Sequence, residues 1–228
     1  MASDEVMEWD DAYQESGHFQ GPPPWNIGEP QPELAALIRS GKIRGDVLDA
    51  GCGVAELSLA LAAEGHTVVG IDLTPTAVAA ATKAAEERGL TTATFVQDDI
   101  TSFGGYDGRF DTIVDSTLFH SLPIEGRDGY LRSAHRAAAP GAVLYILVFA
   151  NGAFPPGAQF GPNTVSEDEL RAAVSKFWTV DEITPAFIHA NMTAAMPPEA
   201  PFTMPAFDKD DKGRDKLPAF LLTAHKGD

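Results

Sequence analysis

Cysteine is almost absent from this chain of 228 residues, which contains only Cys52. A single cysteine cannot form a disulfide within the chain, and it cannot supply a zinc site made of several thiolates. The sequence shows no clustered spacing of other metal ligands, so no metal site is expected. Cys52 lies in a glycine-rich turn with no basic residue beside it, and we interpret it as a small filler rather than a nucleophile.

Positive charge is also scarce, because 16 Lys and Arg stand against 33 Asp and Glu, a formal net charge of −17. Such a surface repels phosphate backbones and anionic membranes, so nucleic-acid and membrane partners are not expected. No apolar run reaches the length of a membrane span, and the first residues are acidic where a signal peptide is basic and then apolar. We therefore expect a cytoplasmic protein, and the sequence leaves its oligomeric state open.

The length and the 44% hydrophobic content suit one globular α/β domain over residues 1–228. An N-terminal arm and helix at 1–40 combine Gly, Pro and aromatic residues, and a core follows at 45–150. Pro32 opens the helical pattern at the end of the arm. We expect the arm to pack over the functional site of the core.

Strand and helix patterns alternate along the core. We expect strands at 47–50, 67–72, 92–97, 110–116 and 142–149, and helices at 54–64, at 75–88 and at 128–138. Thr74 is expected to cap the second of these helices, with Pro75 in its first turn and Gly89 after its end. Parallel strands need crossover connections, so this alternation predicts a doubly wound sheet with helices on both faces.

Two final strands are expected at 177–183 and 218–224, after a helix that begins with the capping-box sequence Ser166 to Glu169. Residues 184–216 between them are rich in Pro and Met, and a connection of this length is typical of a lid over a site. The predicted fold is therefore α/β and Rossmann-like: a doubly wound, mostly parallel seven-stranded sheet with an antiparallel last strand.

The segment from Val47 to Ala55 carries the strongest chemical signal. An apolar strand runs directly into Gly51 and Gly53 and then into a helix. Glycines permit a tight turn and a close approach of a ligand, and the helix start presents unpaired N–H groups. Asp72 ends the next strand, about 20 residues later, where a carboxylate can accept both ribose hydroxyls. Together these features predict a nucleotide-like ligand.

Two acidic residues bear on which nucleotide is bound. The dinucleotide pattern G-x-G-x-x-G/A places a small residue where this chain has Glu56, whose carboxylate would face the pyrophosphate. Asp49 adds a negative charge before the glycines, which is unfavourable beside phosphates and favourable beside a sulfonium or amino group. These charges favour S-adenosylmethionine over NAD.

Four segments resemble, in order, the motifs of the class I S-adenosylmethionine-dependent methyltransferases. They are VLDAGCGVAEL at 47–57, VVGIDL at 68–73, FVQDDI at 95–100 and FDTIVDS at 110–116. The arm, with WDDAY at 9–13 and PPPWNIGEPQP at 22–32, looks like that of the thiopurine, thiol and halide methyltransferase group and of bacterial relatives that act on phenolic or heterocyclic compounds. Ala55 departs from the pattern, because many members have a third glycine there.

The resemblance implies S-adenosylmethionine as the cofactor and assigns residues to its parts. Asp49, Gly51 and Gly53 would line the methionine part. Asp72 would hold the ribose, with Leu73 beside the adenine.

At the far end of the cofactor, the resemblance implies that Asp99 accepts a hydrogen bond from the adenine amino group while Ile100 packs on the ring. We favour Asp99 over the neighbouring Asp98, which would be a solvated residue, because Asp99 directly precedes the apolar Ile100. Asp115 and its neighbours would form the wall near the sulfonium.

Methyl transfer from a sulfonium is an in-line displacement that depends mainly on positioning in a dry pocket, so few catalytic residues are required. His120 follows the fourth strand at the carboxyl end of the sheet, and it is the candidate base or orienter. The alternative is a loop histidine that bonds to the backbone. The expected acceptor pocket is walled by Phe19, Trp25, Phe119, Phe149, Phe154 and His189, with Met192 and Met196.

An apolar, aromatic pocket favours a flat ring as the acceptor, although the same aromatic side chains could instead seal the arm onto the core. The sequence thus predicts methyl transfer from S-adenosylmethionine to O, S or N of a small, aromatic or heterocyclic molecule. Two alternatives are an NAD-dependent oxidoreductase, whose Tyr–Lys pair is not visible, and a non-catalytic protein that binds S-adenosylmethionine.

Overall fold

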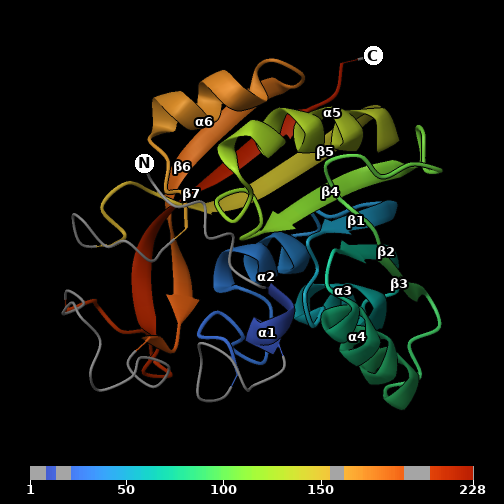
Figure 1. Cartoon of the computed structure of the whole chain (residues 1–228), viewed down its shortest axis with the longest axis horizontal. Coiled ribbons are helices and arrows are strands. Elements are labelled where there is room, and N and C mark those ends of the chain that lie inside the picture. Colours follow the sequence, from blue (N-terminus) through green and yellow to red (C-terminus); the bar gives the residue numbers. More distant parts are fainter. Residues whose placement is uncertain (1–8, 14–21, 155–161, 193–205, 228) are drawn as a thin grey trace.

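The computed structural model describes residues 9–13, 22–154, 162–192 and 206–227. Seven strands in these ranges form one sheet with helices on both faces (Figure 1). The strands are β1 (Asp46–Ala50), β2 (Thr67–Asp72), β3 (Ala93–Gln97), β4 (Phe110–Ser116), β5 (Ala138–Phe149), β6 (Thr179–Ala190) and β7 (Asp215–His225). The helices are α1 (Trp9–Tyr13), α2 (Pro32–Arg39), α3 (Glu56–Ala63), α4 (Pro75–Glu87), the short 3-10 helix η1 (Ile124–Gly126), α5 (Arg127–Ala137) and α6 (Glu167–Val174).

The strand order is β3-β2-β1-β4-β5-β7-β6. Neighbours among the first five strands run parallel, and β7 runs antiparallel to both β5 and β6. The predicted seven-stranded, mostly parallel sheet with an antiparallel last strand is confirmed. The order reverses between β1 and β4, and open α/β sheets bind ligands at such a switch point, beyond the carboxyl ends of the strands.

Each face of the sheet has its own hydrophobic core. Along β4, Ile113 packs into the cluster beneath α5 and α6, while the next residue, Val114, packs into the cluster that includes Leu34 of α2 and Leu61 of α3. This alternation is the two-residue period of a strand buried on both faces. The two buried clusters, one on each face of the sheet, fix the position of the carboxyl end of β1 relative to that of β4.

The hairpin of β6 and β7 is longer than the sequence indicates. Residues 184–190 continue β6 and residues 215–216 begin β7, so the predicted excursion 184–216 is reduced to a connection over 191–214. The extended β6 contains Pro185, which is tolerated there because β6 is an edge strand. A lid role for the connection stays a prediction, and its residues 193–205 lie outside the described ranges.

The ends of two helices test the capping predictions. Pro75 is in the first turn of α4, and Gly89 follows its end with a φ of 66°. The Thr74 hydroxyl, however, makes no helix cap, because it donates to Asp72 instead. The capping box of Ser166 and Glu169 is present at the start of α6. In the described part of the chain, no helix has the length and apolar character needed to cross a membrane.

Candidate cofactor and acceptor site

The turn between β1 and α3 is built on left-handed backbone. Gly51 and Gly53 have φ values of 67° and 53°. A Cβ atom at Gly51 would lie 2.7 Å from the Leu118 side chain, and one at Gly53 would lie 2.7 Å from the Tyr13 hydroxyl. Ala55, at the start of α3, keeps the same conformation with a φ of 68°. The turn therefore needs glycine at two positions and tolerates alanine at the third.

Asp72 is held by the turn that it faces. Its Oδ2 accepts a hydrogen bond from the Gly53 N–H at 2.8 Å, and its Oδ1 accepts from the Thr74 N–H and hydroxyl at 2.9 and 2.7 Å. Each carboxylate oxygen has two acceptor sites, so Oδ1 is filled and Oδ2 retains one site for a further donor. The carboxylate is thus oriented in advance at the carboxyl end of β2, as a ribose-binding residue requires.

Asp49 is a buried acid with one unused oxygen. Its Oδ2 accepts from the Ser58 hydroxyl at 2.6 Å, whereas its Oδ1 has no partner among the described residues. Burial raises the pKa of Asp49 to about 6, and the hydrogen bonds from Ser58 only partly oppose this. A buried carboxylate is costly unless it is paired, so a cationic group beside Oδ1 would be stabilising.

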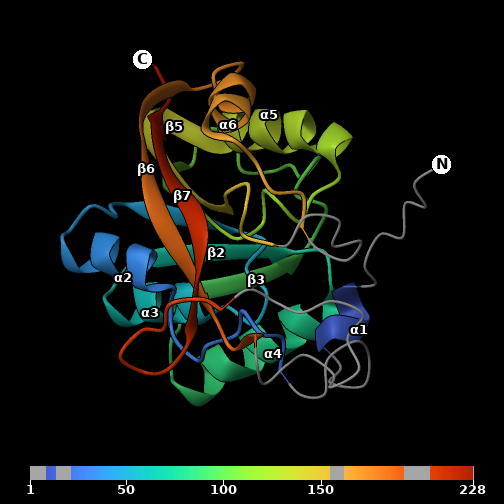
Figure 2. The same cartoon turned by 90° about the vertical axis from the view of Figure 1, so that its left-hand side faces the viewer.

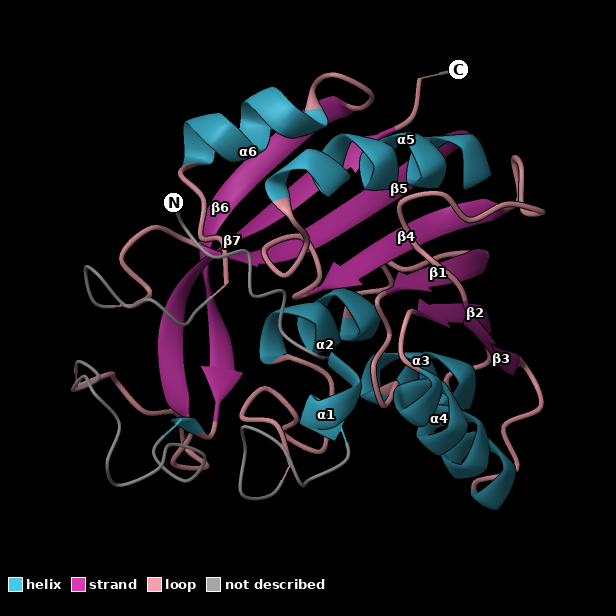
Figure 3. Ribbon diagram, viewed as in Figure 1, coloured by secondary structure: helices cyan, strands magenta, loops and turns pink. Residues whose placement is uncertain are grey.

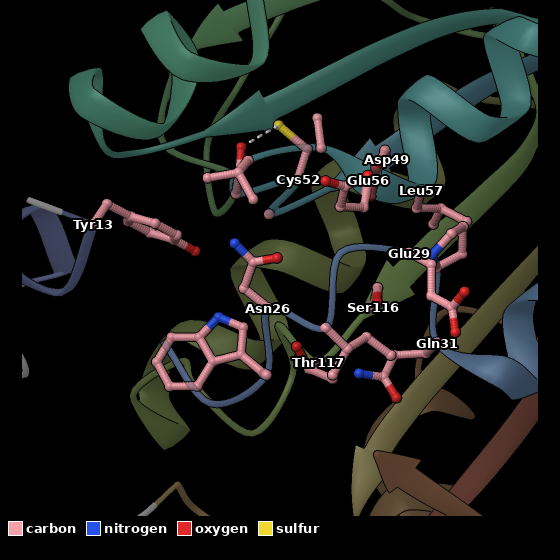
Figure 4. Close-up of a pocket in the computed structure, with 17 residues that line it drawn as sticks. Tyr13, Asn26, Glu29, Gln31, Asp49, Cys52, Glu56, Leu57, Ser116 and Thr117 are labelled. Atoms are coloured by element: carbon pink, nitrogen blue, oxygen red, sulfur yellow. Dashed lines mark hydrogen bonds between the residues drawn. The ribbon is translucent and has the colours of Figure 1, made fainter. Parts of the chain in front are cut away.

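Asp49, Gly51 and Gly53 line a hollow whose empty space, with its open mouth, is about 580 Å³. Asp72 lies behind the turn and does not line the hollow itself. The walls of the hollow come from three parts of the chain: the arm with Tyr13 and Trp25, the turn with Asp49, and the residues after β4, Ser116 and Thr117. Figure 4 shows the Tyr13 ring pointing into the hollow from α1, on the side opposite Asp49 and Glu56.

The hollow fits the methionine part of S-adenosylmethionine. It offers an unpartnered carboxylate oxygen on Asp49 for a cationic group, and Gly51 and Gly53 leave room for a ligand to approach the backbone. No group of three or more metal-ligating side chains occurs in the described part of the chain. The unpartnered oxygen of Asp49 suits the cationic group of an organic ligand.

The residues predicted to contact the adenine lie outside the hollow. Leu73 is 60% exposed just beyond β2, where a flat apolar ring could cover it. Asp99 uses Oδ1 to accept from the Thr101 N–H and hydroxyl. Ile100 is buried in the core beneath α5, so little of its side chain is available to a ligand. None of these residues lines the hollow itself.

Asp115 lies behind the wall of the hollow. It is fully buried, and its Oδ1 accepts from the N–H groups of Leu118 and Phe119 at 2.8 and 3.2 Å. Burial raises the pKa of Asp115 to about 7, against the lowering effect of these backbone bonds. Its neighbours Ser116 and Thr117 face the hollow. Asp115 therefore shapes the loop after β4, and its neighbours present the surface.

His120 is neutral and has a defined tautomer. Its Nδ1 accepts a hydrogen bond from the Phe149 N–H at 3.2 Å, which places the ring proton on Nε2. Burial and the nearby Arg127 lower the pKa of His120 to about 3. Nε2 can thus donate a hydrogen bond, while Nδ1 is already engaged as an acceptor. This geometry fits a residue that orients the acceptor better than a general base. The bond to the Phe149 N–H also matches the alternative prediction of a histidine that bonds to the backbone.

Phe149 and Phe154 lie next to His120. The His120 and Phe149 ring centres are 4.4 Å apart, and Phe154 meets Phe149 edge to face at 5.0 Å. Met192 packs against the hydrophobic cluster that also contains Phe149. The structure therefore brings together His120, Phe149 and Phe154 of the predicted acceptor region, from the loop after β4 and the end of β5.

Other predicted pocket residues are placed differently. Phe119 is fully buried in the core, with the Arg127 guanidinium 4.6 Å over its ring. His189, expected in a loop, belongs to β6 and is 7% exposed, with Nδ1 2.8 Å from Asp210 Oδ2. Trp25 lines the hollow and packs edge to face on Trp9. Phe19 and Met196 lie outside the described residues.

Sequence reasoning missed several residues of the site. Tyr13 and Asn26 line the hollow from the arm, and Ser58 holds Asp49. Ser58 had a recognisable signal, because it is one hydroxyl in the otherwise apolar run LSLALAA, and buried hydroxyls need partners. Tyr13 and Asn26 had no local signal, since only the folded arm brings them to the turn.

Comparison with known proteins connects this site to an enzyme family. Residues 47–141 match a family model described as a methyltransferase domain. The 2-heptyl-1-hydroxyquinolin-4(1H)-one methyltransferase of Mycobacteroides abscessus is 53% identical over 204 residues, which cover 90% of this chain and 89% of that protein.

Two solved structures are also similar. One, from work on the conversion of a disulfide bond into a thioacetal group during echinomycin biosynthesis, gives a TM-score of 0.80 at 30% identity, covering 97% of this chain and 92% of its own. The other is a 1,6-didemethyltoxoflavin-N1-methyltransferase of Burkholderia thailandensis with bound S-adenosylhomocysteine. It gives a TM-score of 0.60 at 23% identity, covering 86% of this chain and 77% of its own, and it shows the fold alone.

Proposed function

Because this chain belongs to the S-adenosylmethionine-dependent methyltransferases, we propose that it methylates O, S or N of a small heterocyclic or aromatic acceptor, with a ring-hydroxylated quinolone as the first candidate. S-adenosylmethionine is its cofactor. Family membership does not favour the NAD-dependent oxidoreductase or the non-catalytic binding protein.

The observation that carries this proposal is the similarity to the hydroxyquinolinone methyltransferase, which extends over nine-tenths of both chains. Near-complete coverage includes the segments that contribute to the acceptor region as well as the shared core. Phe149 and Phe154 offer flat apolar surfaces of the kind that stack on an aromatic ring. The neutral His120 offers an Nε2–H donor that could hold the acceptor oxygen.

In this proposal the residues of the chain bind and orient both reactants. The cofactor, when bound, supplies a methyl group on a sulfonium. Asp49 would pair with its amino group, Asp72 would accept from its ribose hydroxyls, and Ser116 and Thr117 would exclude water near the reacting end. His120 would stabilise an acceptor that has already lost its proton, because it holds no free site to accept one.

The test is transfer of a labelled methyl group from S-adenosylmethionine to a panel of ring-hydroxylated quinolones, phenols, thiols and halides. We expect mass spectrometry to find the methylated quinolone first among the products. Cofactor binding without transfer to any compound would revive the binding-protein alternative. Fluorescence enhancement of NADH on mixing would revive the oxidoreductase.

The finer expectations from the sequence belong to the same proposal. They are a cytoplasmic location, organisation as one domain over residues 1–228, and no nucleic-acid substrate, which rests on the net charge of −17. Cell fractionation, limited proteolysis and the absence of methyl transfer to total RNA would test them in turn.

A further inference from the structure

The outer edge of β6 is covered by the arm. A strand at a sheet edge leaves every second residue with unpaired backbone groups, and the arm satisfies three such positions in succession. The contacts are the Phe187 N–H to Glu33 Oε1 at 3.3 Å, the His189 N–H to Gln31 Oε1 at 2.8 Å, Gln31 Nε2 to the His189 carbonyl at 3.0 Å, and the Asn191 N–H to the Pro24 carbonyl at 2.8 Å. Side chains of Gln31 and of Glu33 in α2, with the Pro24 carbonyl, thus satisfy backbone groups at this edge.

An ion cluster adds to this contact at the far end of the hairpin. Arg214 donates from Nε to Asp210 Oδ2 and from Nη1 to Glu29 Oε1, both at 2.7 Å. Lys212 donates to both oxygens of Glu29 at 2.6 and 2.7 Å, and His189 pairs with Asp210. The side chains of Arg214 and Asp210 are only 9% and 8% exposed. Breaking such a buried pair leaves an uncompensated charge, unlike the loss of a surface pair.

The segment held in this way is a wall of the hollow. Trp25, Asn26, Glu29, Pro30 and Gln31 all line it, together with the glycine turn. Figure 3 shows the β6–β7 hairpin extending beyond the ends of the other strands toward the arm, and Figure 2 shows it passing beside α2. The position of this wall is therefore set by residues more than 150 positions away in the sequence.

We propose that Arg214 is a positioning residue for the cofactor: it lies outside the hollow and, through Glu29, fixes the arm at the distance from the glycine turn that the cofactor requires. Arg214 suits this role because its planar guanidinium bridges two carboxylates on different segments, Glu29 of the arm and Asp210 of the hairpin connection. The proposal rests on the assignment of the hollow as the cofactor site.

The experiment compares Arg214→Gln with wild type by calorimetry with S-adenosylhomocysteine. Gln keeps a donor but loses the charge and one of the two contacts. We expect the Kd to rise about tenfold, which corresponds to about 1.4 kcal/mol. In kinetics with the quinolone acceptor, the KM for S-adenosylmethionine should rise by a similar factor while kcat stays within about twofold.

Two further variants keep the test decisive. Arg214→Lys retains the charge but not the planar bridge, and its Kd for S-adenosylhomocysteine should lie between those of wild type and Arg214→Gln. If Arg214→Gln does not fold, the Kd of Arg214→Lys is compared with wild type instead. Lys176→Gln removes a different ion pair, that of Lys176 with Asp128, which is exposed and joins the region of α6 to α5. This control should leave both Kd and KM unchanged.

An unchanged Kd in folded Arg214→Gln would overturn the proposal, as would a fall in kcat with no change in KM. These outcomes differ from a failure of the cofactor-site assignment, in which Asp72→Ala would also bind normally. A double-mutant cycle with Glu29→Gln should show coupling, because both changes act through one contact.

Discussion

The glycine turn and the arm both line the hollow, but they are held in place differently. In the turn, Asp49 pairs with Ser58 nine residues away, and Asp72 with Gly53 nineteen residues away. The arm depends on Gln31 with His189 and Glu29 with Arg214, at separations of 158 and 185 residues. Contacts between near neighbours close short loops, whereas the contacts of the arm close loops of more than 150 residues and need the β6–β7 hairpin in place. The turn is thus a local structure, and the position of the arm depends on the complete fold.

The largest effect on cofactor affinity is expected from Asp72→Ala, because Asp72 is bonded to the glycine turn. The change removes the acceptor for the ribose hydroxyls and also the bond to the Gly53 N–H. Hydrogen bonds to charged groups contribute about 1.5–3 kcal/mol each, so affinity for S-adenosylmethionine should fall about 100-fold or more. Calorimetry measures this loss, and an unchanged Kd would contradict the assignment of the site.

A second prediction uses the pKa of Asp49, which burial raises to about 6. A cationic ligand requires the ionised form, so affinity for S-adenosylmethionine should be greatest above pH 6 and should fall as pH drops through 6, approaching tenfold per unit. Calorimetry at pH 5, 6, 7 and 8 measures this dependence. Ser58→Ala removes a hydrogen bond that lowers the pKa, and it should move the midpoint to higher pH.

Asp49→Asn is the control for this dependence. This variant should bind S-adenosylmethionine weakly at every pH. The fall in affinity near pH 6 that comes from protonation of Asp49 should be absent. Asp115 titrates nearby, with a pKa of about 7, and its contribution should persist in this variant. A wild-type affinity that is flat from pH 5 to 8 would show that Asp49 does not pair with the cofactor.

A third prediction concerns His120 on the acceptor side. Its pKa of about 3 means that it stays neutral in the working range, so the pH profile of kcat should show no His120 limb between pH 5 and 8. His120→Asn keeps an acceptor for the Phe149 N–H but removes the Nε2 donor. We expect kcat to fall about tenfold with an unchanged profile and an unchanged Kd for S-adenosylmethionine. Loss of a limb near pH 6–7 in this variant would instead identify a general base.

The smallest effect is expected from Ala55→Gly in the turn. The left-handed φ of 68° costs alanine about 1–2 kcal/mol, while removal of its buried methyl costs about 0.8 kcal/mol. The net gain is about 0.5 kcal/mol, or about 1–2 °C in Tm. Gly51→Ala is the matched opposite, because its Cβ would meet Leu118, and its Tm should fall. A lower Tm for Ala55→Gly would show that packing outweighs backbone strain there.

Much of the cofactor half could be predicted from the sequence. Strands β1 and β2, the two glycines and the position of Asp72 follow from apolar runs that end at residues with special backbone or charge requirements. The doubly wound, mostly parallel sheet follows from the alternation of strands and helices, whereas the strand order became known only from the structure. What the local pattern did not reveal was orientation: Asp115 turns away from the hollow to hold Leu118 and Phe119.

The acceptor half was predicted less well. Phe119 was assigned to the pocket because of its residue type and its place after β4, but it packs in the core under Arg127. The assignment of His189 to a loop was wrong, because β6 continues beyond the predicted end at residue 183 as far as Ala190. In both cases the deciding factor was which neighbours the sheet supplied from distant segments.

The sequence by itself determined the fold class, the glycine turn and the acidic residues that suit a cationic cofactor, because these depend on short-range backbone preferences and on charges already fixed in the chain. Only the tertiary structure decided that His120 is a neutral donor and that the arm is fastened to the edge of β6. Both results depend on burial and on hydrogen bonds between segments far apart in sequence, and neither exists before the sheet has brought those segments together.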